Sequence, residues 1–235
     1  MTDGLYVLEL DGMQQSAVDL ADPTRLVFDY VRRIGDLVDA ISPVPPAPLR
    51  VLHVGGAAMT LPRYVAATRP RSSQIVLEPS AETIERVRAE APLPARSGIR
   101  VRPVGGEEGI LAVRDGSQDL VVLDAFSGGA VPGSLTSAAY AEQVGRVLAP
   151  GGLFVANLVD RPPYRQVRSF VAAVGALGDI AVGAEPATLK GRRAGNLVVA
   201  SGALPADAFG HPSPLAYRVF RGRAVADAFG GGRAS

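Results

Sequence analysis

Cysteine is absent from the 235 residues, and histidine occurs only twice, as His53 and His211. The lack of cysteine excludes disulfides, thiolate catalysis and cysteine ligands for a metal ion. His53 lies in an apolar run that predicts a buried strand, and His211 lies in a segment flanked by prolines. We therefore expect no bound metal and no histidine-based catalytic triad, and we expect structural or solvated roles for both side chains.

Long apolar runs and an excess of one charge are also missing. No run approaches the roughly 18 to 20 apolar residues of a membrane span. The start, MTDGLYVLELDG, lacks the basic and apolar regions of a signal peptide. The net charge is +1 and the arginines are scattered, which is not typical of a nucleic-acid binder. The content of 47% hydrophobic residues is ordinary for a folded globular protein, and the length suffices for one α/β domain. Together with these absences, it predicts a soluble, cytoplasmic protein that binds neither nucleic acid nor membrane.

The most informative stretch runs from Leu49 to Glu78. An apolar strand reaches Val54, Gly55 and Gly56 follow at once, and a helix leads to a second apolar strand that ends on Glu78. Glycines let a backbone approach a bound nucleoside, and an acid at the end of the second strand can accept both ribose hydroxyls. The pattern predicts a nucleoside site. The alternative is a glycine turn and a solvated glutamate in an ordinary α/β protein.

The dinucleotide fingerprint GxGxxG is missing from this unit, because Ala57, Ala58 and Met59 follow the two glycines. In that fingerprint a pyrophosphate rests on the N-terminus of the helix. Its absence favours a smaller nucleoside without phosphates, such as S-adenosylmethionine.

Strands and helices alternate through the rest of the chain. The alternation predicts a doubly wound, mainly parallel α/β sheet of the S-adenosylmethionine-dependent methyltransferase-like (Rossmann-like) type, whose last strand can run antiparallel. Ligands of such sheets bind beyond the carboxyl ends of the strands, so four loops should converge on one cleft, namely 55–60, 78–80, 105–108 and 124–129. Seven strands are expected, at residues 49–54, 74–78, 99–104, 119–124, 153–159, 179–184 and 196–201.

Three regions are expected along the chain. Residues 1–48 comprise a small β-hairpin that turns at Asp11-Gly12, an amphipathic helix and the proline-rich linker SPVPPAP. Residues 49–202 form the nucleoside-binding, methyltransferase-like domain. Residues 203–235 form a C-terminal extension whose tail, GGGRAS, is expected to be disordered.

Five segments within about residues 5–202 are informative because they follow one another in a particular order along the chain. They are LELDGMQQ, VLHVGGAAMTLPRY, VLEPS, LVVLDAFSGGAVP and ATLKGRRAGNLVVAS. Together they resemble the spermidine synthases (polyamine aminopropyltransferases). The resemblance implies transfer of an aminopropyl group from decarboxylated S-adenosylmethionine to an amine, with methylthioadenosine as product, and a homodimer.

The same resemblance assigns residues to roles. It places Gln15 near the thioether, Gly55, Gly56 and Glu78 on the nucleoside, and Asp124 at the base that takes the proton of the amine. The alternative for Asp124 is a structural cap of the loop after the fourth predicted strand.

Four matched positions depart from the chemistry of the family. The aspartate that contacts the aminopropyl ammonium is Ala58 here, and a second aspartate that binds the amine is Ser127. The aspartate that contacts the adenine falls on Gly106, with Glu107 beside it as a stand-in, and a helix tyrosine falls near Phe28. An ammonium ion without a paired anion is costly in a low-dielectric cleft. The two lost carboxylates therefore argue against ordinary spermidine synthesis.

Three functions remain open on these residues. The first, which we favour, is a spermidine synthase-like transferase with an activity weakened by the lost acids. The second is an S-adenosylmethionine-dependent methyltransferase that produces S-adenosylhomocysteine, since Ala58 would leave room for the α-carboxylate of the intact cofactor. The third is a non-catalytic, dimeric binding or scaffold protein. The sequence leaves the acceptor open between a small amine and another nucleophile.

Overall fold

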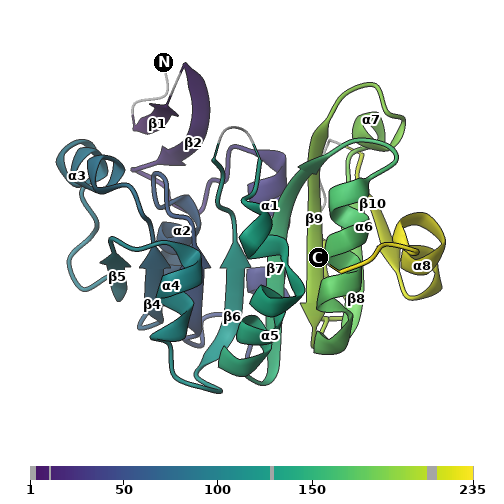
Figure 1. Cartoon of the computed structure of the whole chain (residues 1–235). Helices are drawn as coiled ribbons and strands as arrows, with labels where there is room; N and C mark the ends of the chain where they lie inside the picture. Colours follow the sequence, from purple (N-terminus) through teal and green to yellow (C-terminus); the bar gives the residue numbers. More distant parts are fainter. Residues whose placement is uncertain (1–3, 11, 128–129, 211–215, 235) are drawn as a thin grey trace.

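The computed structural model describes residues 4–10, 12–127, 130–210 and 216–234 (Figure 1). Its main sheet has eight strands in the order β10-β8-β9-β7-β6-β3-β4-β5. The strands from β3 to β7 run parallel to their neighbours in this series, whereas β9 is antiparallel to both β7 and β8, and β10 is antiparallel to β8. Their bounds are β3 Arg50–Val54, β4 Ser73–Leu77, β5 Ile99–Arg102, β6 Gln118–Leu123, β7 Leu148–Asp160, β8 Asp179–Ala184, β9 Gly195–Gly202 and β10 Arg218–Arg221.

The predicted methyltransferase-like fold is confirmed, but the predicted number of strands is one too low. All seven predicted strands are present, and the eighth, β10, lies in the C-terminal extension. Its sequence, RVFR, has only two apolar residues, so no local pattern marks it as a strand. It forms because the free edge of β8 provides hydrogen-bond partners and Phe220 packs against the core.

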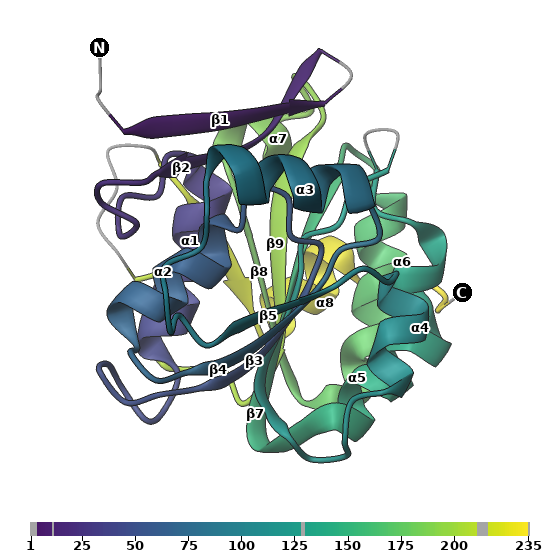
Figure 2. The ribbon, with the colours of Figure 1, turned by 90° about the vertical axis from the view of Figure 1, so that its left-hand side faces the viewer.

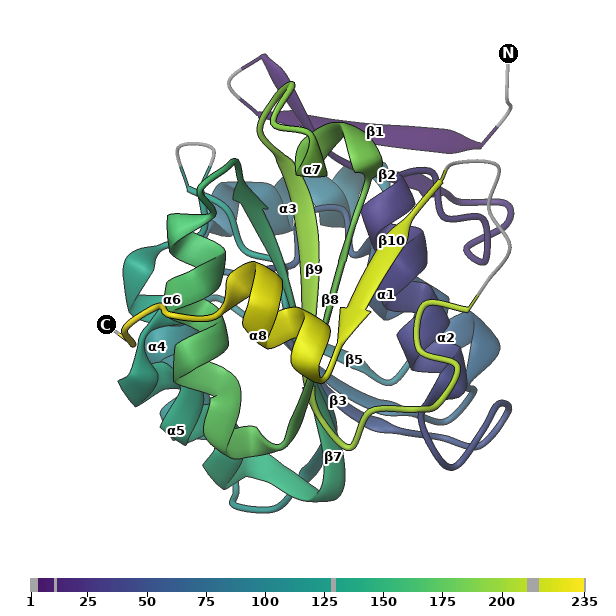
Figure 3. The ribbon, with the colours of Figure 1, turned by 90° about the vertical axis from the view of Figure 1, so that its right-hand side faces the viewer.

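Helices cover both faces of this sheet (Figure 3). One face carries α1 (Asp29–Ala40) and α2 (Thr60–Thr68), whose apolar side chains share a core with residues of β3, β6, β7, β8 and β9. The other face carries α4 (Gly106–Leu111), α5 (Ala138–Val147), α6 (Arg165–Val174) and α8 (Arg223–Phe229). Alternate residues of the buried strands point to opposite faces, which is why these strands are mostly apolar.

The remaining helices are α3 (Ala81–Glu90), α7 (Pro186–Leu189) and two short 3-10 helices, η1 (Gly133–Thr136) and η2 (Gly175–Leu177). Val87 of α3 shares an apolar cluster with Val76 of β4. Part of the predicted disordered tail lies against α6, where Ser169 donates a 2.8 Å hydrogen bond to the carbonyl of Arg233. Among the described residues, none of the helices combines the length and the apolar character that crossing a membrane requires.

The N-terminal hairpin forms a second, two-stranded antiparallel sheet of β1 (Leu5–Leu10) and β2 (Met13–Asp19). Figure 2 shows it next to α3, beyond the carboxyl ends of the parallel strands. Tyr6 donates a 2.9 Å hydrogen bond to Glu90 of α3, and Ser16 is 2.8 Å from the hydroxyl of Thr60 at the start of α2. These contacts hold the hairpin over the loops in which the nucleoside site is expected.

Candidate functional site

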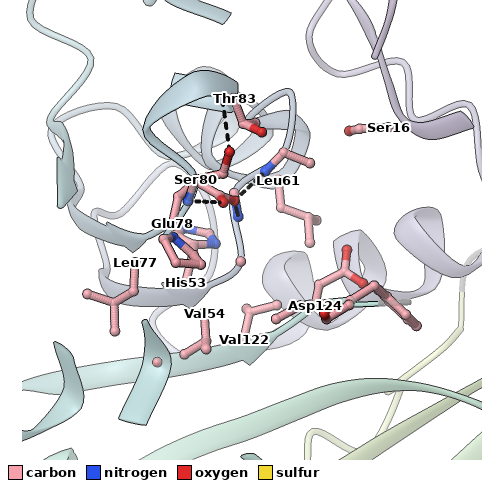
Figure 4. Close-up of a pocket in the computed structure, with 18 of the residues that line it drawn as sticks. Ser16, His53, Val54, Leu61, Leu77, Glu78, Ser80, Thr83, Val122 and Asp124 are labelled. Atoms are coloured by element: carbon pink, nitrogen blue, oxygen red, sulfur yellow. Dashed lines mark hydrogen bonds between the residues drawn. The ribbon is translucent and has the colours of Figure 1, made fainter. Parts of the chain in front are cut away.

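A cavity of about 620 Å³ lies at the carboxyl ends of the parallel strands (Figure 4). All four loops that were expected to converge contribute residues to its lining. The hairpin contributes Glu9 and Ser16, and α1 contributes Tyr30 and Val31. The cavity is thus enclosed by the sheet edge, by the hairpin and by the first helix.

Gly55 connects β3 to the cavity and requires the conformation that only glycine adopts easily. Its φ is +90°, and a Cβ atom built on it would lie 2.4 Å from the carbonyl oxygen of Asp124. Any side chain at this position would therefore clash with the backbone at the end of β6. The glycine brings the loop after β3 into direct contact with the residue predicted to act as the base.

Glu78 follows β4, is 9% exposed and lines the cavity. One carboxylate oxygen accepts hydrogen bonds from the amides of Gly56 and Ala57, at 3.0 and 3.2 Å. The other accepts a 3.0 Å hydrogen bond from the amide of Ser80. Each carboxylate oxygen has two lone pairs, so the second oxygen keeps one of them, and Glu78 can order the glycine loop and still accept a hydrogen bond from a ligand.

Asp124 follows β6 and is partly exposed to the same cavity. Its Oδ1 accepts a 3.0 Å hydrogen bond from Asn157, and its Oδ2 accepts a longer one, 3.4 Å, from the hydroxyl of Tyr30. Burial of the carboxyl raises its pKa to about 6, although both hydrogen bonds favour the charged form. A carboxyl that titrates close to neutral pH can both accept and release a proton.

The aromatic residue of α1 that lines the cavity is Tyr30, whereas Phe28 is not part of the lining. The two rings stack in parallel with their centroids 6.2 Å apart, and the hydroxyl of Tyr30 points to Asp124. Burial, and then the negative charge of Asp124, raise the pKa of Tyr30 well above its usual range. The sequence contained a signal for the contact with Asp124, because Tyr30 lies only two residues beyond Phe28, the position predicted from the resemblance.

The two positions with a lost acid differ in their surroundings. Ala58 is fully buried in an apolar cluster that includes Leu8, Val18 and Met59, and it does not line the cavity. Its small side chain therefore adds no room for a ligand. Ser127 is exposed and lines the cavity, and its amide donates a 2.9 Å hydrogen bond to the carbonyl of Ala130.

The segment after β5 provides Gly106 and Glu107, which begin α4, and both line the cavity. A Cβ atom at Gly106 would lie 2.5 Å from Val54 and 2.8 Å from Leu135, so no side chain fits there. Glu107 is exposed and accepts a hydrogen bond from the hydroxyl of Ser134, which makes it the acid of this segment that can reach a ligand. Gln15 belongs to β2, and its side chain lies outside the described part of the structure.

Acidic side chains predominate among the charged residues that line the cavity. His53 adds no charge at neutral pH, because burial lowers its pKa to about 4, and its Nε2 lies 2.9 Å from Gln74. Sequence reasoning missed the charged residues of the hairpin and α3, whose approach depends on tertiary packing. Five carboxylates and one guanidinium line the cavity, namely Glu9, Glu78, Glu82, Glu107, Asp124 and Arg86. This balance favours a cationic ligand.

A metal ion finds no comparable set of ligands. Among the described residues, no group of three or more His, Asp or Glu side chains is placed to hold one.

Comparisons with known proteins agree with this geometry. No family model matches the chain. A polyamine aminopropyltransferase of Chromobacterium violaceum is 28% identical over 145 residues, which are 61% of this chain and 53% of that protein. The matched region is thus about half the length of this curated relative. The crystal structure of a probable spermidine synthase from Corynebacterium glutamicum covers 99% of this chain and 88% of its own, with 27% identity and a TM-score of 0.91.

A third comparison supports the fold alone. A spermidine synthase in complex with the transition state analogue AdoDATO superposes with a TM-score of 0.62 at 16% identity, over 95% of this chain and 77% of its own.

The sheet topology and the cleft at its carboxyl edge define a protein of the S-adenosylmethionine-dependent methyltransferase-like class. Within this class, the chain is similar in sequence and fold to the spermidine synthases and polyamine aminopropyltransferases.

Proposed function

We propose that the protein binds decarboxylated S-adenosylmethionine and transfers its aminopropyl group to a small amine. The observation that carries the proposal is Asp124, which lies in an acidic cavity directly beside the glycine loop. Two relatives named for this chemistry support it. The complex of the fold neighbour with AdoDATO supports a nucleoside of this type.

The reaction assigns one task to each feature of the site. Glu78 and the glycine loop hold the nucleoside, and Asp124 accepts a proton from the attacking amine. The amine nitrogen then forms a bond to the aminopropyl carbon next to the sulfonium. The carbon–sulfur bond breaks and its electron pair stays on sulfur, which leaves neutral methylthioadenosine.

The charge of the cavity favours aminopropyl transfer over methyl transfer. Decarboxylated S-adenosylmethionine carries a sulfonium and an ammonium, whereas the intact cofactor adds a carboxylate that the acidic lining would repel. Ala58, which was expected to make room for that carboxylate, is packed away from the cavity.

Product analysis decides between the functions. We expect methylthioadenosine to appear when the protein is incubated with decarboxylated S-adenosylmethionine and a series of small amines. S-adenosylhomocysteine formed from the intact cofactor would select the methyltransferase. If calorimetry detects no binding of any adenosine thioether, the protein has a non-catalytic role.

Glu78→Ala is expected to weaken the binding of methylthioadenosine at least about tenfold, because hydrogen bonds to a charged acceptor contribute roughly 1.5 to 3 kcal/mol each. Calorimetry measures this affinity directly. Glu82→Gln is the matched control, since it removes an exposed carboxylate from the same lining. An unchanged affinity in the Glu78 variant would place the nucleoside elsewhere.

Ser127→Asp is expected to raise the formation of spermidine from putrescine, which should be weak in the wild type. The new carboxylate faces the cavity, and a charge-assisted hydrogen bond to the diamine contributes about 1.5 to 3 kcal/mol, or roughly tenfold or more in rate. Ser127→Asn has the same shape without the charge and should not raise the rate. Strong spermidine synthesis by the wild type would show that another acid already holds the diamine.

A further inference from the structure

We infer that Asn157 is a positioning residue for the base of this reaction, and that its amide serves Asp124 both before and after the proton transfer. The inference rests on the proposed role of Asp124 and extends it to a residue that does not line the cavity.

The placement of Asn157 is fixed by the sheet. It lies in β7 between β6 and β9, directly after Ala156, which pairs with Leu123 of β6, and it pairs with Val198 of β9. Its side chain is fully buried, and its Nδ2 donates a 3.0 Å hydrogen bond to Oδ1 of Asp124. With neighbours on both sides of β7, the strand cannot shift to weaken this contact.

The amide is unexpected at this position. Residues around it in β7 are apolar and fully buried, and an unpaired amide is costly in such surroundings. No described residue offers a partner to Oδ1 of Asn157. A side chain with one unpartnered acceptor persists here because its other half contacts Asp124.

This unpartnered oxygen has a use in the reaction. While Asp124 is ionised, it needs a donor, and the NH₂ group of Asn157 is that donor. After Asp124 has accepted a proton, its hydroxyl becomes a donor and needs an acceptor. A half-turn of the amide presents Oδ1, so one side chain can pair with both states of the base.

Among the described residues, Asn157 from β7 and Tyr30 from α1 donate hydrogen bonds to the carboxyl of Asp124. Tyr30 is uncharged, and both groups donate to the carboxylate, which lowers the pKa that burial raises. The hydrogen bond from Asn157 is 3.0 Å long and the one from Tyr30 is 3.4 Å long, so the contact with Asn157 is the closer one. Removing the amide should therefore raise the pKa of Asp124.

The test compares Asn157→Leu, which removes the donor, with Asn157→Asp, which replaces it by a second carboxyl. The pH dependence of kcat/KM is measured together with the titration of Asp124, followed by NMR of ¹³C-labelled aspartate. We expect the acid limb to move up by roughly half a pH unit or more in the leucine variant. It should move further in the aspartate variant, because two adjacent carboxyls share one proton.

A matched control distinguishes positioning from a general loss of packing. Ser201→Ala removes another buried hydrogen bond, from Ser201 to the carbonyl of Val174, and should leave the acid limb in place. The affinity for methylthioadenosine should stay within about twofold in every variant, since neither Asn157 nor Ser201 lines the cavity.

The outcomes separate the positioning role of Asn157 from the proposed reaction. If neither Asn157 variant moves the titration of Asp124, or if both only lose nucleoside binding, Asn157 is an ordinary core residue and the inference is wrong. If the titration moves in the expected order but no amine is transferred, the positioning role stands and the proposed reaction fails.

Discussion

Asp124→Asn is expected to lower turnover by about two to four orders of magnitude while the nucleoside still binds. The asparagine keeps the shape of the carboxyl but cannot take the proton of the amine. In the wild type, turnover should fall as the pH drops through about 6, because Asp124 then becomes protonated. Steady-state kinetics between pH 5 and 8, with calorimetry for the nucleoside, provide the measurement.

The same substitution should make the protein more stable at pH 7. The folded state raises the pKa of Asp124 from 3.8 to about 6, so it binds this proton more tightly than the unfolded chain does. Wild-type stability is therefore lost as the pH rises from about 4 through about 6, by about 1 to 3 kcal/mol. Urea unfolding should show a gap between variant and wild type at pH 7 that narrows toward pH 4.

Asp119 offers the matched control for Asp124. It lies on the same strand but forms an ion pair with Arg50, and it does not line the cavity. Asp119→Asn should leave turnover unchanged and alter stability by less than about 1 kcal/mol. Equal turnover of Asp124→Asn and the wild type would reduce Asp124 to a structural cap.

Ala58→Asp is expected to destabilise the fold by about 3 to 5 kcal/mol, the typical effect of a buried charge without a partner. Ala58 is fully buried in a cluster with Leu8 and Val18 of the hairpin and Val87 of α3, and it does not line the cavity. An acid at this position, which the resemblance to the spermidine synthases suggests, should therefore not increase spermidine synthesis. Urea unfolding measures the first effect, and formation of spermidine from putrescine measures the second.

Ser127→Asp is the comparison for this variant, because the same acid at an exposed position should change stability by less than about 0.5 kcal/mol. An Ala58→Asp protein as stable as the wild type, with increased spermidine formation, would show that position 58 faces the ligand in solution.

The unit from β3 to Glu78 could be predicted because its signals are local. A short apolar run favours a buried strand and two glycines favour a turn, and the structure has the strand, the turn and the acid at the expected residues. The central strands of the main sheet were predictable for the same reason, since burial on both faces makes them mostly apolar.

The missed features depend on contacts between distant segments. Which aromatic residue near the start of α1 lines the cavity depends on how α1 packs on the sheet, and this packing places Tyr30 rather than Phe28 at Asp124. The orientation of position 58 follows from the docking of the hairpin, which covers Ala58 with Leu8. The contact between Asn157 and Asp124 joins two neighbouring strands across 33 residues of sequence. No periodicity within one segment contains this information.

Strand β10, near the C-terminus, covers the edge of the main sheet that β8 would otherwise form. Without it, the outer edge of β8 would have unpaired backbone groups, a template for pairing with another chain. The outermost strands are instead β5, IRVR, and β10, RVFR, each four residues long with two arginines. Short, charged borders disfavour strand addition. Both margins of the sheet are thus protected against aggregation.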